Sequence, residues 1–263
     1  MVLSLDPVSL VSISTFIASI PFIIILISQK KIKDFFSIKH LKTILSVAFF
    51  TAAGQAFLFI GTKLTSGTNT GLLLQLEPVY SLILGFFLLK EIIKTSQIGV
   101  TLLMVLGAVT IVYKGGARIN LGDILILLSP LMYQISHFIG KQLLNKKVSV
   151  NLILAGRQFF GGLFLMAFTF ILNRSLTNLT DVNYLTTGLF LGAFTATVAL
   201  IWYTSIKKIP VSIASSFLPI TALVSLVGSV LFLKETISIQ QYIGFFLIVG
   251  GMLWQTKLLS KNK

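Results

Sequence analysis

The chain contains no cysteine, two histidines and only seven acidic residues among 263. The absence of cysteine excludes disulfides, thiolate metal sites and a cysteine nucleophile. The histidines, His40 and His137, stand far apart in the sequence, so no metal-binding cluster is visible. Few acids leave little room for the paired carboxylates that many hydrolytic and metal-assisted enzymes use. We therefore expect no cofactor, no metal and no enzymatic activity.

Charge of either sign is scarce and apolar residues are abundant. Only 11% of the residues are charged, 55% are hydrophobic, and the mean hydropathy is +0.96. A soluble domain carries about a quarter charged residues. The apolar residues come in runs of about twenty, the length that crosses a hydrocarbon core as a helix. Because barrel strands would alternate apolar and polar residues, the sequence predicts an all-α polytopic membrane protein.

Nine apolar runs are separated by short polar connections, so no soluble domain fits and the active part is expected within the membrane. The nine predicted spans are residues 8–28, 43–61, 68–89, 96–113, 121–143, 150–172, 184–204, 211–233 and 240–257.

Basic residues give the chain a formal net charge of +14, yet they sit in short clusters between the apolar runs. Such clusters indicate membrane topology rather than a nucleic-acid surface, so the expected surroundings are a lipid bilayer and no nucleic acid. Counted in alternate connections, lysine and arginine number fifteen on one side and five on the other. The larger set comprises Lys30, Lys31, Lys33, Lys39, Lys42, Lys90, Lys94, Lys141, Lys146, Lys147, Lys207, Lys208, Lys257, Lys261 and Lys263. The smaller set comprises Lys63, Lys114, Arg118, Arg174 and Lys234.

The positive-inside rule places the larger set in the cytoplasm, so the C-terminus is predicted inside and the N-terminus outside the cell membrane. Residues 1–7 carry no lysine or arginine, and the positive cluster follows the first apolar run. A signal peptide has its charge on the other side. The first run is therefore predicted to be a true span.

Two segments of the chain resemble each other at an offset of 144 residues. Segment 84–107 matches segment 228–251 at Leu89 and Leu233, Lys90 and Lys234, Glu91 and Glu235, Gln97 and Gln241, and Gly107 and Gly251. The two segments lead into the fourth and the ninth predicted spans. An odd number of membrane crossings separates these spans, so the two copies would have opposite orientations in the membrane. Inverted repeats are typical of alternating-access transporters, whose site lies between the halves near the bilayer midplane.

The paired motif resembles the EamA-like members of the drug/metabolite transporter superfamily. In the first half it is GLLLQLEPVYSLILGFFLLKE with Gln97 and Gly99, and in the second SIASSFLPITALVSLVGSVLFLKE with Gln241 and Gly244. The resemblance implies transport of small metabolites such as amino acids, often driven by proton exchange. It also implies a fold of two inverted five-helix repeats.

The family pattern has ten spans, whereas this sequence shows nine. Alignment of the halves sets LDPVSLV near residue 6 opposite VSVNLIL near residue 150. We therefore expect a first repeat of four spans in residues 1–116, with its first helix missing. The second repeat, residues 117–263, has five.

Glu77 lies near the middle of an apolar span, where an acidic side chain costs about 2.5 to 3.5 kcal/mol on insertion scales. It is predicted either to couple transport to protons or bind a cation, or to be a neutral carboxyl hydrogen-bonded to a neighbour. The adjacent Pro78 lacks a backbone donor and leaves a carbonyl free, which opens the helix at the same depth. Pro219 occupies the corresponding span of the second half.

Other polar residues inside the spans are candidates for a substrate site. Tyr133, Gln134 and His137 form a polar stripe on one helix with Lys141, which is typical of a cavity lining. Arg157 is predicted either to bind an anionic group or to extend to the membrane surface. Glu91 and Glu235, at span ends, are interpreted as structural contacts. Trp202 and Tyr203 are interpreted as interfacial aromatic residues.

The function these features favour is secondary transport of a small metabolite. Two alternatives stay open: a membrane-embedded transferase acting on a lipid-linked substrate, and a channel or non-transporting membrane subunit. A homo-oligomer is compatible with all three.

Overall fold

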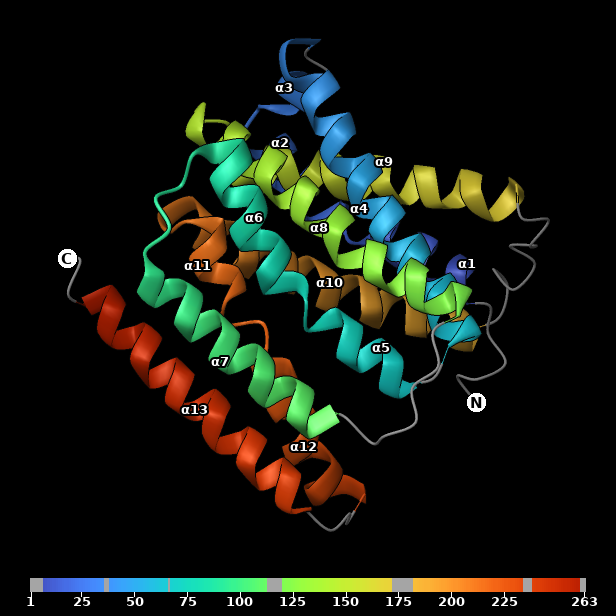
Figure 1. Ribbon diagram of the computed structural model, residues 1–263. Helices are drawn as coiled ribbons and strands as arrows, with labels where there is room; N and C mark the ends of the chain where they lie inside the picture. Colours follow the sequence, from blue (N-terminus) through green and yellow to red (C-terminus); the bar gives the residue numbers. More distant parts are fainter. Residues whose placement is uncertain are drawn as a thin grey trace. The chain divides into compact units, whose positions relative to one another are not determined.

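The computed structural model describes residues 7–35, 38–65, 67–112, 120–171, 182–233 and 238–260. These residues form thirteen α-helices and no strand, which confirms the all-α class (Figure 1). Among the described residues, five helical segments are long and apolar enough to cross a membrane: Val8–Ser28, His40–Leu64, Leu121–Asn145, Val150–Ile171 and Val182–Lys208. Shorter apolar helices cover Glu77–Leu89, Thr95–Thr110 and Val211–Val224. The class of polytopic membrane protein is thus supported, while the count of nine spans and the missing first helix stay predictions.

The chain divides into two compact units, and each combines segments from both halves of the sequence. The first unit comprises Met1–Ile60 and Ile135–Lys208, and the second Gly61–Gln134 and Ile209–Lys263. The first contains α1 (Pro7–Ile17), α2 (Ile20–Ser28), α3 (Ile32–Phe35), α9 (Val150–Ile171) and α10 (Val182–Lys208). The second contains α5 (Gly67–Leu74), α6 (Glu77–Leu89), α7 (Thr95–Val112), α11 (Val211–Ser215), α12 (Ile220–Leu233) and α13 (Ile239–Ser260). Helices α4 (Ile38–Leu64) and α8 (Leu121–Asn145) have residues in both.

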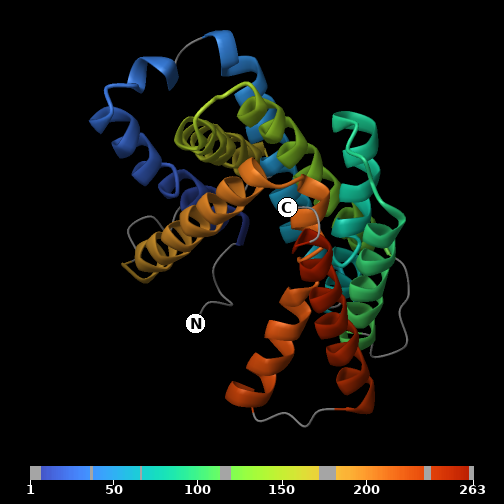
Figure 2. The ribbon, with the colours of Figure 1, turned by 90° about the vertical axis from the view of Figure 1, so that its left-hand side faces the viewer.

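In the first unit, α1 packs against α9 and α10. The rings of Phe16 on α1 and Phe159 on α9 lie 5.1 Å apart, centroid to centroid. The short α3 follows α2 and precedes α4, as Figure 2 shows. Helix α3 contacts α9, where Phe35 stacks on Phe160 at 5.6 Å.

Three of the predicted spans are each divided between two helices, and each division lies beside a proline. Helix α5 gives way to α6 just before Pro78, α11 to α12 around Pro219, and α1 to α2 just before Pro21. Within the second break the backbone keeps its hydrogen bonds in tighter turns, in which each N–H donates to the carbonyl three residues earlier: Leu218 N–H donates to Ser215 O at 3.0 Å. Local tightening of this kind satisfies groups that the proline leaves unpaired inside a membrane.

The glutamines of the duplicated motif cap the starts of α7 and α13. Gln97 Oε1 accepts the backbone N–H of Lys94 at 3.0 Å, and Gln241 Oε1 accepts that of Ser238 at 2.8 Å. Each glutamine is the third residue of its helix, the position at which a capping box satisfies the N-cap donor. Both copies of the motif thus perform the same local task.

The glycines of the same motif lie where α7 and α13 pack together, side by side in Figures 1 and 2. A Cβ at Gly107 would lie 2.9 Å from the backbone oxygen of Gly244 and from Ile248 Cγ1. Gly251, on α13, faces Met104 of α7 in the same way. Small residues let membrane helices approach closely. The core of this unit comprises Val100, Met104, Ala108, Ala222 and Ile248.

Gly107→Ala is expected to destabilise the protein, because its methyl group would meet the backbone of α13. Overpacking of this kind costs about 1 to 3 kcal/mol. Gly250→Ala is the matched control, since no heavy atom lies within 4 Å of a Cβ there. Thermal unfolding of the purified protein in detergent should show a lower melting temperature for the first variant alone. Equal melting temperatures would mean that α7 and α13 do not pack at Gly107.

Candidate functional site

Among the described residues, two clusters of polar side chains contain residues that the sequence marks as candidates, and one lies in each unit. The cluster of the second unit is built on Glu77, the first residue of α6. Gln134 Nε2–H donates to Glu77 Oε1 at 2.9 Å and to the hydroxyl oxygen of Ser215 at 3.1 Å. Gln134 and Ser215 have no exposed surface, whereas Glu77 is half-buried. Two of the predicted site residues, Glu77 and Gln134, are therefore direct partners.

The chemistry of the Gln134 amide suits a carboxyl that changes its protonation. In the observed arrangement its NH₂ group donates to Glu77, as an ionised carboxylate requires. Because an amide carries an acceptor oxygen beside its donors, rotation by half a turn would let it accept a hydrogen bond from the O–H of a neutral Glu77. Ser215, which also lies 3.3 Å from Gln134 Oε1, can both donate and accept. Gln134, with Ser215 as its own partner, can thus form a hydrogen bond with Glu77 in both the ionised and the protonated state.

Glu91 makes a structural contact at a span end, as the sequence indicated. Its carboxylate accepts the backbone N–H of Val211 at 3.1 Å and that of Ser212 at 3.4 Å, and the Ser212 hydroxyl as well. These are the first amides of α11, which otherwise have no partner within the helix. Glu91 therefore caps α11. The second copy, Lys234 and Glu235, lies outside the described residues.

The cluster of the first unit is built on Arg157 of α9, which is only 7% exposed. Its Nε–H donates to Thr51 Oγ1 at 2.9 Å, and its guanidinium carbon lies 5.6 Å from the centre of the Tyr203 ring. Within the described residues no carboxylate forms an ion pair with it. The guanidinium has five N–H donors, and the bond to Thr51 engages one of them.

A line of hydroxyls continues from Arg157 into α4 and α8. Thr51 Oγ1 and Ser136 Oγ lie 2.7 Å apart, and Ser136 donates to the carbonyl of Val47 at 2.9 Å. In one consistent arrangement Arg157 donates to Thr51, Thr51 to Ser136, and Ser136 to Val47. The backbone of α4 thereby fixes the position of the arginine.

Aromatic rings form the other wall of this cluster. The His137 ring lies 4.9 Å from that of Trp202 and 6.2 Å from that of Tyr203, centroid to centroid. Tyr203 has no exposed surface, so its interpretation as an interfacial residue was wrong. The reason is Gly140 on α8, where a Cβ would lie 2.5 Å from the Tyr203 hydroxyl oxygen and prevent the ring from entering.

The predicted site residues thus fall into different places. Gln134 joins Glu77, whereas His137, three residues later on α8, joins the Arg157 cluster, and Tyr133 is half-buried on the same helix. The Lys141 ammonium donates to the carbonyl of Ile206. The sequence did not point to three residues of the clusters, Thr51, Ser136 and Ser215, and it assigned Tyr203 to the membrane interface. No signal marks the hydroxyls, because single serines and threonines are common in membrane helices.

Comparison with known proteins agrees with this architecture. The EamA-like transporter family matches residues 1–113 and 120–256. An uncharacterised transporter of Archaeoglobus fulgidus is 28% identical over 94% of this chain and 88% of its own length. The uncharacterised transporters YetK and YoaV of Bacillus subtilis are 27% and 24% identical, over 74% and 98% of this chain and 61% and 90% of their own lengths.

A solved crystal structure superposes with a TM-score of 0.81 over 99% of this chain and 90% of its own, at 16% sequence identity, which supports the fold. The family covers both halves of the sequence and so includes both polar clusters. The chain therefore belongs to the EamA-like transporter family.

Proposed function

We propose that the protein is a secondary transporter that moves a small metabolite bearing a carboxylate, such as an amino acid, across the cytoplasmic membrane by alternating access. Exchange of a proton at Glu77 supplies the driving force. The observation that carries the proposal is a carboxyl inside an apolar span whose partner, Gln134, can serve both of its protonation states. Membership of a transporter family favours this over the transferase and the non-transporting subunit.

The surroundings of Arg157 support a carboxylate as the group of the substrate that the protein recognises. A buried cation without an acidic partner is costly in an apolar interior, and an anionic ligand would offset that cost. The guanidinium presents a planar fork that matches the two oxygens of a carboxylate. Its bond to Thr51 and its stacking on Tyr203 hold it in place while leaving donors for the substrate.

The topology that accompanies this proposal has two inverted repeats, the N-terminus outside and the C-terminus in the cytoplasm. The fifteen-to-five bias of basic residues supports it. A reporter fused after Lys263 should be active only in the cytoplasm. Activity only outside would reverse the assignment.

Glu77→Gln should abolish transport driven by a pH gradient, because the amide keeps the size and hydrogen bonding of the carboxyl but cannot release a proton. The measurement is uptake of labelled amino acids into proteoliposomes with and without an imposed pH gradient. Exchange of substrate between two equal pools does not require net proton movement, so it should persist in the variant. Persistence would also show that the variant is folded.

Glu91→Gln is the matched control for that experiment. It removes a carboxyl from the same unit, but from a position that caps α11. Its transport is expected to respond to the pH gradient as the wild type does. Coupling lost in Glu91→Gln and kept in Glu77→Gln would place the proton at Glu91 and refute the assignment.

Arg157→Gln should weaken substrate binding by about 10- to 150-fold, since a hydrogen bond to a charged group contributes about 1.5 to 3 kcal/mol. Binding is measured by titration of the purified protein with the transported compound and with its uncharged amide. The variant should discriminate far less between the two. If it prefers the carboxylate as strongly as the wild type, Arg157 has only a structural role.

A further inference from the structure

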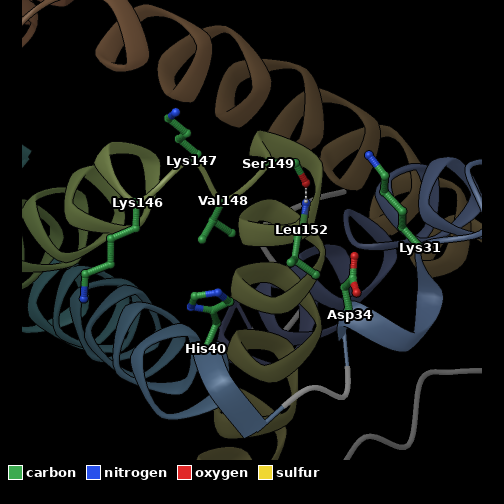
Figure 3. A pocket seen from close by; sticks show the side chains of 8 residues that line it. All are labelled: Lys31, Asp34, His40, Lys146, Lys147, Val148, Ser149 and Leu152. Carbon is green, nitrogen blue, oxygen red and sulfur yellow. Dashed lines mark hydrogen bonds between the residues drawn. The ribbon is translucent and has the colours of Figure 1, made fainter.

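A second cationic site lies in the first unit, away from the Arg157 cluster. A cavity of about 330 Å³ opens where helices α2, α3, α4, α8 and α9 begin or end (Figure 3). Its lining comprises Lys31, Asp34, His40, Lys146, Lys147, Val148, Ser149 and Leu152. Three of these residues are lysines and one is an aspartate, so the lining carries an excess of positive charge. A volume above about 300 Å³ is that of a small-ligand pocket.

The cavity is surrounded by the ends of candidate membrane spans, as expected of a site at the membrane surface. Lys31 is three residues past the end of the Val8–Ser28 span, and Lys146 directly follows the Leu121–Asn145 span. Ser149 directly precedes the Val150–Ile171 span, and His40 is the first residue of the His40–Leu64 span. Four apolar segments therefore start or stop around it. Lipid headgroups occupy this level of a bilayer.

Two of the helices that reach the cavity end in the same unusual way. Lys147 has φ 62°, its N–H donates to Leu144 O at 2.9 Å, and Val148 N–H donates to Leu143 O at 3.1 Å. The end of α2 repeats the pattern with Lys30 at φ 57°. This is the Schellman helix end, whose left-handed position is usually glycine because a Cβ is unfavourable there. Of these two lysines, Lys147 lines the cavity.

Attraction to the negative end of a helix favours lysines after α2 and α8. The same cavity receives the start of α9, where Ser149 Oγ accepts the N–H of Leu152 at 3.2 Å. A helix start carries partial positive charge. Three lysines and a helix start thus lie around one cavity together with a single carboxylate, Asp34. An anionic ligand would offset this excess of positive charge.

We propose that this cavity binds the phosphate of an anionic phospholipid headgroup. Phosphate is the anion that lysines and a helix start recognise together. A lipid supplies it at the level of the bilayer where the cavity opens, whereas a soluble phosphate would have no such preference. The proposal does not depend on the transport function, and bound lipid would tie together the ends of α2, α8 and α9.

The test is a titration of the purified full-length protein in neutral detergent with short-chain phosphatidylglycerol. The rise in melting temperature gives the half-saturating concentration, because a ligand stabilises the state that binds it. Phosphatidylcholine of the same chain length controls for the acyl chains, and glycerol 3-phosphate tests a soluble phosphate. We expect stabilisation by phosphatidylglycerol at a concentration at least tenfold below that of either control.

Lys31→Gln with Lys146→Gln removes two positive charges from the cavity and should raise the half-saturating concentration at least tenfold. These two lysines are chosen because neither has a strained backbone. Lys31→Arg with Lys146→Arg should retain binding and shows that the pair tolerates substitution. Lys207→Gln with Lys208→Gln, exposed at the end of α10, removes equal charge elsewhere and should bind as the wild type does. Unchanged binding in the Lys31 and Lys146 glutamine variant would overturn the proposal. Equal loss in the control pair, or equal stabilisation by glycerol 3-phosphate, would overturn it as well.

Discussion

A polar group inside a bilayer finds no water, so its hydrogen-bond partners must come from the protein, and this constraint shapes both units. The broken spans show it for the backbone, where tightened turns beside Pro219 keep carbonyls bonded. The side chains follow the same rule: Thr51, Ser136 and Val47 O support Arg157, and Gln134 supports Glu77. A group that can change its partner without losing a bond is then a suitable place for chemistry.

Helix α11 illustrates how this constraint connects structure and function. Five residues are too few to form a stable helix alone. Glu91 holds its first amides, and Ser215 at its last position bonds to Gln134, the partner of Glu77. Under the proposed function, a proton on Glu77 reorients the Gln134 amide and alters its bond to Ser215. Helix α8 also supplies Ser136 to the Arg157 cluster, so one helix contributes a side chain to each cluster.

The sequence predicted the helical class, the family and the isolated carboxyl, because all three depend on local composition and motif. The glutamines and glycines of the duplicated motif were noticed as identities, and the structure explains them as helix caps and close contacts. The contacts that Arg157 and Glu77 make with their partners could not be predicted. They are single hydroxyls and amides brought together from helices up to 106 positions apart, and apolar periodicity carries no information about such pairs. Tyr203 was misplaced for a related reason, because its burial depends on Gly140 of another helix.

The central claim is that Glu77 gains and loses a proton as substrate is carried. Infrared difference spectroscopy of the protein in lipid, recorded on adding substrate, detects the C=O band of a protonated carboxyl directly. The wild type and Glu91→Gln should show a change in this band, and Glu77→Gln should lack it. A band change that persists undiminished in Glu77→Gln would contradict the account and assign the proton to another group.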